Sequence, residues 1–367
     1  VRTCHRDTCP VGIATQRPDL RAKFAGTPEM VAAYLLFVAE ETRRLLAGLG
    51  LRSLGEAIGR TELLSRKPVG DDRADRLDLS PLLWRSDEPS KFVEAVPLQK
   101  ARSSLGDRLL TDAFPAISEG RILELSYPIT NSDRTVGALL GGEIARSFGD
   151  RRPPGRVRVR FQGAAGQSFA AFLSDGVEFD LTGEANDYVG KGMGGGRIVI
   201  RPGEADAGEP VLIGNTVLYG ATGGQLFCAG AAGERFAVRN SGAVAVVEGV
   251  GDHALEYMTG GAVVVLGPIG HNLGAGMTGG EAYVYDDAGL LPVRVNPQLV
   301  ELQEPSAAQL PSLRRLVERH ERATGSVRAR AILDDWDERS PSFVRIVAKA
   351  EVALIEAALE GTAPAGA

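Results

Sequence analysis

The segments Gly242-Ala-Val-Ala-Val-Val247, Gly261-Ala-Val-Val-Val-Leu266 and Gly280-Glu-Ala-Tyr-Val-Tyr285 share one pattern. In each, a glycine leads into a short run of residues that are mostly valine, alanine or aromatic, and valine and aromatic residues favour β-strands. The glycines recur 18 to 28 residues apart, and the longest interval contains the polar insertion Gly203–Pro210. A unit of about 20 residues is too small to bury its own strand, so it must stack on its neighbours. Four earlier segments of the same kind begin at Gly155, Gly176, Gly196 and Gly224.

Stacked units of this length predict a mainly β fold, a right-handed parallel β-helix of about seven turns with glycine at its corners. We place this domain at residues 121–300, with a further turn around Thr135 to Ile144. A leucine-rich repeat would need a leucine–asparagine frame that the sequence lacks, and a propeller blade needs about twice the length. We expect all strand pairing between Gly155 and Tyr285 to be parallel. We also expect four valines to stack inward on successive turns, namely Val199, Val246, Val264 and Val284.

Helices are predicted before the β-helix. Thr27 is a good N-cap and Pro28 suits the first helical turn, and apolar residues then recur at helical spacing as far as Leu49. A second, shorter helix is predicted over Ser53 to Ile58. Residues 1–64 are therefore expected to form a helical module.

The segments on either side of the β-helix domain differ in character. Residues 65–120 are charged, dotted with proline and poorly periodic, which predicts a linker with short helices. Residues 301–367 are predicted to form a helical tail. Its two amphipathic stripes are expected over Leu310 to Val317 and over Val347 to Leu359.

The composition excludes several classes of protein. A net charge of −6 argues against a nucleic-acid binder, and Arg156, Arg158 and Arg160 alternate with apolar residues as on the solvent face of a strand. The longest apolar run, Ala32 to Ala39, is eight residues, well short of the roughly 20 that cross a membrane. Three cysteines give no disulfide framework, so we expect a reducing compartment, the cytoplasm.

Other motifs are interpreted as structural. Gly190–Gly195 and Gly274–Gly279 match the dinucleotide-binding pattern G-x-G-x-x-G. That fingerprint requires a helix after the glycines, whereas both runs lead into predicted strands, so we interpret them as corner glycines. Asp252 and His253 resemble part of an acid–base cluster, but bonding to turn backbones is the favoured interpretation. We therefore assign no catalytic residue.

Two cysteines lie close together near the start, in Val1-Arg-Thr-Cys4-His-Arg-Asp-Thr-Cys9-Pro-Val-Gly12. Two thiolates on one tight loop can share a soft metal or an iron–sulfur cluster. A C-x4-C pair is a weak signal by itself, because zinc sites usually show a shorter spacing and a second pair. Spacing alone therefore favours two ordinary thiols. The remaining cysteine, Cys228, ends a predicted strand, where we expect a small buried residue.

The longer sequence around these cysteines resembles the cluster loop of the glutamate synthase large subunit, at the end of its FMN-binding barrel. It reads Cys4-His-Arg-Asp-Thr-Cys9-Pro-Val-Gly-Ile-Ala-Thr-Gln16. In that family three cysteines spaced C-x5-C-x4-C hold a 3Fe–4S cluster. The resemblance implies that Cys4 is the second ligand and Cys9 the third. Because the first would precede Val1 and no initiator Met is present, we expect a C-terminal piece of a longer polypeptide, with residues 1–64 ending a (β/α)8 barrel. Arg6 and Asp7 stand where the family commonly has Leu and Asn, which leaves the spacing unchanged.

The β-helix region carries the same resemblance. Leu218-Tyr-Gly-Ala-Thr-Gly-Gly-Gln-Leu-Phe227 and Gly274-Ala-Gly-Met-Thr-Gly-Gly280 look like the C-terminal GXGXG domain of glutamate synthase. The C subunit of formylmethanofuran dehydrogenase is a weaker likeness, sharing the β-helix but not the preceding cysteine loop. The sequence departs from the glutamate synthase pattern at Ala254-Leu255, commonly Gly-Cys, and at Ala348 to Glu351, commonly Pro-Arg-Asp. Neither departure touches a cluster ligand.

The resemblance implies an oxidoreductase that makes L-glutamate from L-glutamine and 2-oxoglutarate, with electrons relayed through the 3Fe–4S cluster to FMN. The electrons would come from NADPH through a small partner subunit, which makes an NADPH-dependent enzyme our expectation, or from ferredoxin. Glutaminase and FMN-binding residues would lie in upstream domains of the same polypeptide. We therefore expect the 367 residues alone to bind no FMN and to make no glutamate. The chain would supply Cys4, Cys9 and a structural β-helix.

Two alternatives come from other classes of protein. The first is a freestanding β-helix scaffold subunit with no redox role. A barrel upstream with a cysteine separated from Cys4 by five residues would exclude that alternative. The second is a carbohydrate-active β-helix, which would need acidic or aromatic residues along a groove, and only 6% of the residues are aromatic.

Overall fold

A computed structural model describes residues 11–13, 18–67, 70, 75–85, 104–203, 208 and 210–352. The chain divides into two compact units, Val1–Gln99 and Lys100–Ala367. Among the helices described in these ranges, none has the length and apolar character needed to cross a membrane. The described helices of the first unit are α1 (Pro18–Arg21), α2 (Pro28–Gly48), α3 (Leu54–Ala57) and the 3-10 helix η2 (Thr61–Leu63).

The two helices predicted in the first unit are confirmed. The hydroxyl of Thr27 accepts a hydrogen bond from the amide of Met30 at 3.3 Å, which caps α2. The hydroxyl of Ser53 caps α3 in the same way, accepting from the amide of Glu56 at 3.2 Å. Both ends therefore follow from the capping residues that the sequence displays.

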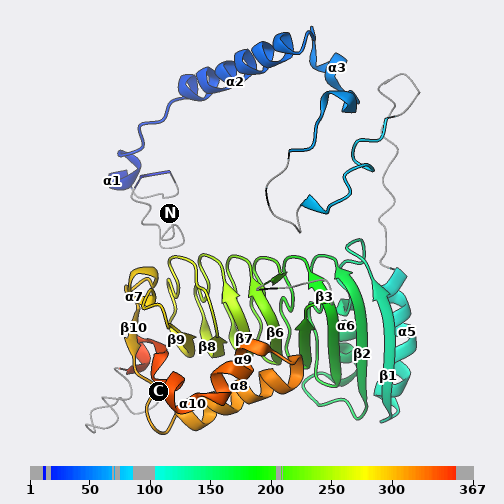
Figure 1. The fold of residues 1–367 in the computed structure, drawn as a ribbon, viewed down its shortest axis with the longest axis vertical. Coiled ribbons are helices and arrows are strands. Elements are labelled where there is room, and N and C mark those ends of the chain that lie inside the picture. Colours follow the sequence, from blue (N-terminus) through cyan, green and yellow to red (C-terminus); the bar gives the residue numbers. More distant parts are fainter. Residues whose placement is uncertain are drawn as a thin grey trace. The chain divides into compact units, whose positions relative to one another are not determined.

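The second unit is a β-solenoid, shown in Figure 1 as a row of parallel turns. Its long sheet begins with β1 (Ile122–Ile129) and continues in the order β2-β3-β4-β6-β7-β8-β9, and every neighbouring pair on this path is parallel. The mainly β solenoid and the parallel pairing are thus confirmed. The seven predicted strands are β2 (Arg156–Ala165), β3 (Val177–Ala185), β4 (Arg197–Arg201), β6 (Gln225–Ala232), β7 (Ser241–Val250), β8 (Thr259–Val265) and β9 (Gly279–Tyr285).

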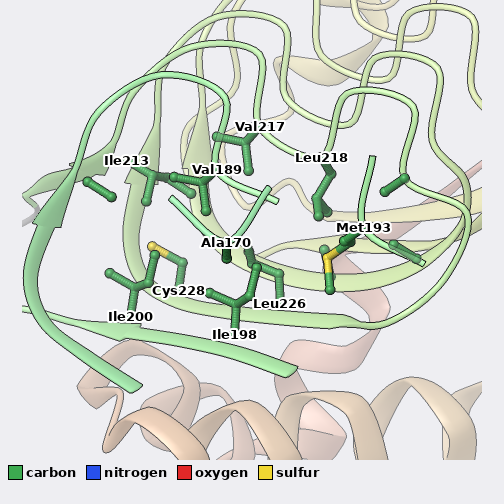
Figure 2. Packing of buried hydrophobic residues seen from close by; sticks show 14 of the residues in the cluster. Ala170, Val189, Met193, Ile198, Ile200, Ile213, Val217, Leu218, Leu226 and Cys228 are labelled. Carbon is green, nitrogen blue, oxygen red and sulfur yellow. The ribbon is translucent and has the colours of Figure 1, made fainter. Parts of the chain in front are cut away.

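The core runs along the inside of the solenoid. Inward side chains stand in register on successive strands, for example Ile200, Cys228 and Val247. Figure 2 shows Ile198, Ile200, Leu226 and Cys228 pointing into the interior, where they meet side chains from the opposite wall. The short strand β5 (Val211–Ile213) pairs with β3 and β6 on a second wall. Because each turn is apolar inside, stacking buries one continuous core.

The predicted inward stacking of four valines is wrong for three of them. Val199, Val246 and Val264 do stand in register on their strands, with Phe227 between the first two, but they lie on the outer face. There they pack against buried residues of the C-terminal helices. Val284 does face the interior. Both faces of these strands are buried, so the sequence reads as a continuous apolar run and does not show which face is inside.

The N-terminal end of the solenoid differs from the prediction. The additional strand is β1 (Ile122–Ile129), parallel to β2, whereas Thr135 to Ile144 contains a turn and most of helix α6 (Ala138–Phe148). Helix α5 (Ser104–Ser118) falls in the range expected to be a linker. Its Leu109, Ala113 and Ile117 are fully or almost fully buried in the core of the solenoid. The helix therefore belongs to the solenoid unit.

The C-terminal segment returns along the outside of the solenoid. After α7 (Leu291–Arg294), helix α8 (Leu310–Thr324) packs on the outer face, with Leu313 and Val317 buried as its predicted stripe requires. Figure 1 shows α8 lying across several strands. It is followed by α9 (Val327–Asp334), α10 (Trp336–Arg339) and the 3-10 helix η3 (Ser340–Ser342).

Two antiparallel strands close the C-terminal end of the sheet. Strand β11 (Phe343–Ala348) pairs with β9, and β10 (Val300–Gln303) pairs with β11. Val347 is therefore a strand residue, which corrects the helix expected to begin there. Residues 349–352 are helical, which agrees with that part of the prediction, and the rest of the predicted helix, beyond residue 352, lies outside the described residues.

The third side of the solenoid, here called the triplet side, is built from left-handed backbone. On each of six turns, three alternating residues have φ between +55° and +73°. Their amides bond to neighbouring turns: on one turn Arg235 donates to the carbonyl of Asp252, Ala237 to Val217 and Arg239 to Glu256, each at 2.8 Å. A residue other than glycine pays roughly 1 kcal/mol or more for this conformation. The triplets are Ser168/Ala170/Phe172, Tyr188/Gly190/Gly192, Thr216/Leu218/Gly220, Arg235/Ala237/Arg239, His253/Leu255/Tyr257 and Asn272/Gly274/Gly276.

Candidate functional site

The predicted cluster ligands Cys4 and Cys9 lie outside the described residues, so their assignment stays a prediction. The backbone just after them is described at Gly12, whose φ is +80°. A Cβ at this position would collide with the carbonyl oxygen of Leu20 in α1. Only glycine fits there, so the segment that follows the cysteine pair makes a tight turn.

The third cysteine is unsuited to binding a cluster. Cys228 is fully buried inside the solenoid, and burial raises the pKa of its thiol above the usual range. Its predicted role as a small buried residue is confirmed. Elsewhere in the described part of the chain, no group of three or more His, Cys, Asp or Glu side chains is arranged to hold a metal. The described residues therefore offer no rival to the predicted cysteine loop.

The two G-x-G-x-x-G runs are confirmed as turns of the solenoid. Gly190 and Gly192 have φ of +64° and +63°, and Gly274 and Gly276 have φ of +71° and +73°. Each run leads into a strand, β4 or β9, and neither starts a helix. A dinucleotide site needs the N-terminus of a helix behind these glycines, so the runs do not form one.

Asp252 bonds to a turn backbone, as predicted. Its Oδ1 accepts a hydrogen bond from the amide of His271 at 2.6 Å and lies 3.3 Å from Nδ1 of the same histidine. The backbone hydrogen bond from His271 lowers the pKa of Asp252, and the side-chain hydrogen bond with the same histidine adds to this effect. Asn215 makes the equivalent bond two turns earlier, accepting from the amide of Glu234 at 2.7 Å. These side chains join successive turns.

The arginines of β2 lie on an exposed face that carries ion pairs. Nε of Arg158 donates to Asp180 at 2.7 Å, and Arg160 lies 2.9 Å from Glu124 on the neighbouring strand. The residues that alternate with them along β2 are buried. The predicted solvent face is confirmed. Its arginines have carboxylates as neighbours, which disfavours a phosphate-binding patch.

Sequence reasoning missed one buried polar network. Glu248 on β7 accepts hydrogen bonds from Ser326 and, at 3.2 Å, from Nε2 of His320. His320 and Ser326 come from the C-terminal helical segment and are 0% and 4% exposed. Glu248 and Ser326 also line a cavity of about 430 Å³ between that segment and the outer wall of the solenoid. The helical pattern of α8 gave no signal for this network, because its partner is about 70 residues away in sequence.

Helix α2 exposes a row of large apolar side chains. Tyr34, Leu35 and Val38 are 67%, 60% and 42% exposed, and no residue of the helix is buried. Isolated apolar side chains are normal on a surface, but a contiguous row of this size marks an interface with another protein surface. Sequence periodicity alone predicted these residues as the packing face of a helix, and the described part of the first unit does not cover them.

Comparisons with known proteins agree with this architecture. Residues 106–349 match the profile of a family described as "GXGXG motif", and residues 1–52 match one described as "Conserved region in glutamate synthase". The chain is 46% identical over 356 residues to "Glutamate synthase [NADPH] large chain" of Azospirillum brasilense. It is 44% identical over 360 residues to "Ferredoxin-dependent glutamate synthase, chloroplastic" of Spinacia oleracea, and 44% over 365 residues to "Glutamate synthase [NADH]" of Schizosaccharomyces pombe.

The solenoid and the family match define the class of protein: the chain belongs to the GXGXG family. More particularly, it is related to the glutamate synthases, since these alignments cover 95% to 97% of the chain. The chain spans only 24%, 22% and 17% of the length of these three relatives. The predicted relationship to glutamate synthase large chains is confirmed.

Proposed function

We propose that this chain is part of a glutamate synthase, in which it supplies two ligands of a 3Fe–4S cluster and the β-helix that supports the catalytic domains. The whole enzyme would make L-glutamate from L-glutamine and 2-oxoglutarate. The observation that carries this proposal is the similarity over nearly the whole chain to glutamate synthases that use different electron donors.

Within that enzyme, the thiolates of Cys4 and Cys9 are proposed to bind the cluster. Thiolates are the ligands that iron–sulfur clusters take, and the turn at Gly12 supports a compact loop around them. When bound, the cluster would relay electrons to FMN held by upstream residues. A third thiolate would come from upstream as well, because Cys228 is buried inside the solenoid. Thiols that bind iron must stay reduced, so we propose a cytoplasmic location.

Residues 1–64 are proposed to be the end of the FMN-binding barrel. The exposed row on α2 supports this proposal, since a barrel helix packs its apolar face on the strands of the barrel. The remaining barrel and the glutaminase domain would belong to the rest of the polypeptide. The solenoid and its C-terminal helices would serve as a rigid support.

The electron donor is proposed to be a small NADPH-oxidising subunit or ferredoxin. The printed names of the relatives include NADPH, NADH and ferredoxin forms, so they support electron input without selecting its source. Reconstituting the full-length enzyme with each donor and following 2-oxoglutarate-dependent glutamate formation would select one.

The cluster assignment is tested in the full-length enzyme by Cys4→Ser and Cys9→Ser. We expect each variant to lose the EPR signal of the cluster and glutamate formation, while glutamine hydrolysis continues. His5→Ser, between the two cysteines, is the matched control and should keep the signal. An undiminished signal in Cys9→Ser would overturn the assignment and favour the alternative, a β-helix scaffold without a redox role. The 367-residue chain alone should retain no FMN after purification.

A further inference from the structure

The outward side chains of the triplet side form a surface that is both basic and aromatic. We call it the basic–aromatic face. Its members are Phe172, Lys191, Tyr219, Arg235, Arg239 and Tyr257. Phe172 is 53% exposed, Arg235 and Arg239 are exposed, and the other three side chains are half-buried.

The side chains of this face hold one another in place. Nη1 of Arg239 donates to the hydroxyl of Tyr219 at 3.3 Å. The guanidinium of Arg239 also lies 5.9 Å from the ring centroid of Tyr219 and 6.0 Å from that of Tyr257, within reach of cation–π attraction. Three turns of the solenoid are thereby linked on their outer surface. A surface ordered in advance loses little side-chain entropy on binding.

Two residues of this face, Arg239 and Tyr257, adopt a backbone conformation that is unfavourable for residues other than glycine. The last residue of the triplet is glycine on three turns, at Gly192, Gly220 and Gly276, and glycine adopts a positive φ without penalty. Arg239 and Tyr257 occupy the same position on other turns, with φ of +57° and +55°. For bulky residues this conformation is unusual, and such strain concentrates at functional positions. Because three turns have glycine at this position, the fold itself does not require a side chain there.

The charge of this face points to an acidic partner. Lys191, Arg235 and Arg239 give it a positive surface in a chain of net charge −6. Glu256 beside them is 7% exposed and contributes little to the surface. Carboxylates lie at the corner that directly precedes the triplets, namely Asp187, exposed Glu234 and Asp252, and they would repel the continuous charge of a nucleic-acid backbone. A protein can place its acids to meet the three cations alone.

We propose that the basic–aromatic face is a docking surface for a carboxylate-rich segment of a partner protein. Its carboxylates pair with Arg235, Arg239 and Lys191, and its apolar groups pack on the exposed rings. This inference is independent of the cluster proposal, because it would hold equally for a β-helix without a redox role.

The test measures binding of a fluorescein-labelled acidic peptide, in which three glutamates are separated by apolar residues, to the 367-residue chain by fluorescence anisotropy. We expect binding at low salt that weakens as salt is added. The decisive variant is Arg239→Gly, which inserts the residue that other turns use at this position. It should keep or raise the melting temperature while weakening binding about fivefold. Arg322→Ala, on the exposed surface of α8, is the control and should bind as the unmodified chain does.

Four results would overturn the proposal. One is the absence of binding of the acidic peptide at low salt. Another is Arg239→Gly binding as tightly as the unmodified chain. A third is an equal loss of binding in Arg322→Ala, which would mean that any surface arginine suffices. The fourth is a single-stranded oligonucleotide that displaces the labelled acidic peptide at a lower concentration than the unlabelled peptide does, which would assign the face to nucleic acid.

Discussion

The ring of Tyr257 lies over Gly276 on the next turn of the solenoid. A Cβ at Gly276 would be 2.5 Å from both Cδ1 and Cε1 of that ring. Phe172 and Gly192 repeat the arrangement elsewhere on the triplet side, where a Cβ would be 2.7 Å from Cε1 of the phenylalanine. Glycine is thus required at these two positions for two reasons, a left-handed backbone and an aromatic ring above it.

Gly276→Ala is expected to destabilise the chain by about 2–4 kcal/mol, because it adds a steric clash to the cost of a left-handed alanine. Gly289→Ala is the matched control, with φ of +66° and no atom near its Cβ position. It should lose only about 1 kcal/mol. Urea unfolding of both variants measures the difference, and equal losses would show that the ring yields without cost.

Asp252 should make stability depend on pH in the acid range. Its pKa is lowered in the folded state by the hydrogen bond from His271, so the carboxylate stabilises the fold above its unfolded pKa of about 4. This stabilisation is lost as the pH falls through the lower, folded pKa. Asp252→Asn keeps the acceptor oxygen without the charge. Its melting temperature should therefore lie below that of the unmodified chain at pH 6 and converge with it near pH 2. A constant difference across this range would contradict the assignment.

Glu248→Ala is expected to loosen the C-terminal helices. The substitution leaves buried His320 and Ser326 without their shared acceptor, which costs about 3 kcal/mol. Glu248→Gln keeps an oxygen at the same place and should lose less. Limited proteolysis between α8 and α9 reports the effect directly. If the alanine and glutamine variants are cut at the same rate, the network does not hold the helices.

Cys228 should resist thiol reagents until the chain unfolds. In a background with Cys4 and Cys9 replaced by serine, we expect no reaction at pH 8 and one thiol titrated in guanidinium, because burial excludes the reagent and raises the pKa of the thiol. Cys228→Ser, which buries a hydroxyl, should cost about 1–3 kcal/mol, whereas Cys228→Val should cost less. Fast labelling of the folded chain would mean that the solenoid opens locally at β6.

The order and parallel pairing of the strands were predictable, because glycine spacing and apolar runs report them directly. Which face of each strand is inside was not. Val246 and Val247 are adjacent and both fully buried, one under α8 and one in the interior. Helix α5 was not predicted to be part of the solenoid, because the strands that it packs against come later in the sequence. The charged segment before it also has the composition of a linker.

The triplet side was predicted only where it contains glycine. Arg239 and Leu255 adopt the same left-handed backbone as Gly192 and Gly274, but side-chain propensity disfavours it, so a sequence pattern cannot reveal it. The hydrogen bonds between turns impose this conformation from outside the local sequence. The prediction for the cysteine loop, in contrast, depends only on the resemblance of its sequence, because Cys4 and Cys9 lie outside the described residues.

Helix α8 makes its main contacts with four strands, β4, β6, β7 and β8. In a solenoid where each turn contacts only its neighbours, the terminal turns can unfold one at a time, because unfolding one of them breaks a single interface. A helix that crosses several turns makes their loss interdependent. Hydrogen exchange should therefore report the middle of the solenoid and α8 opening as one cooperative block. Strands β1 and β2, which pack with α5 instead, are free to open at a different free energy.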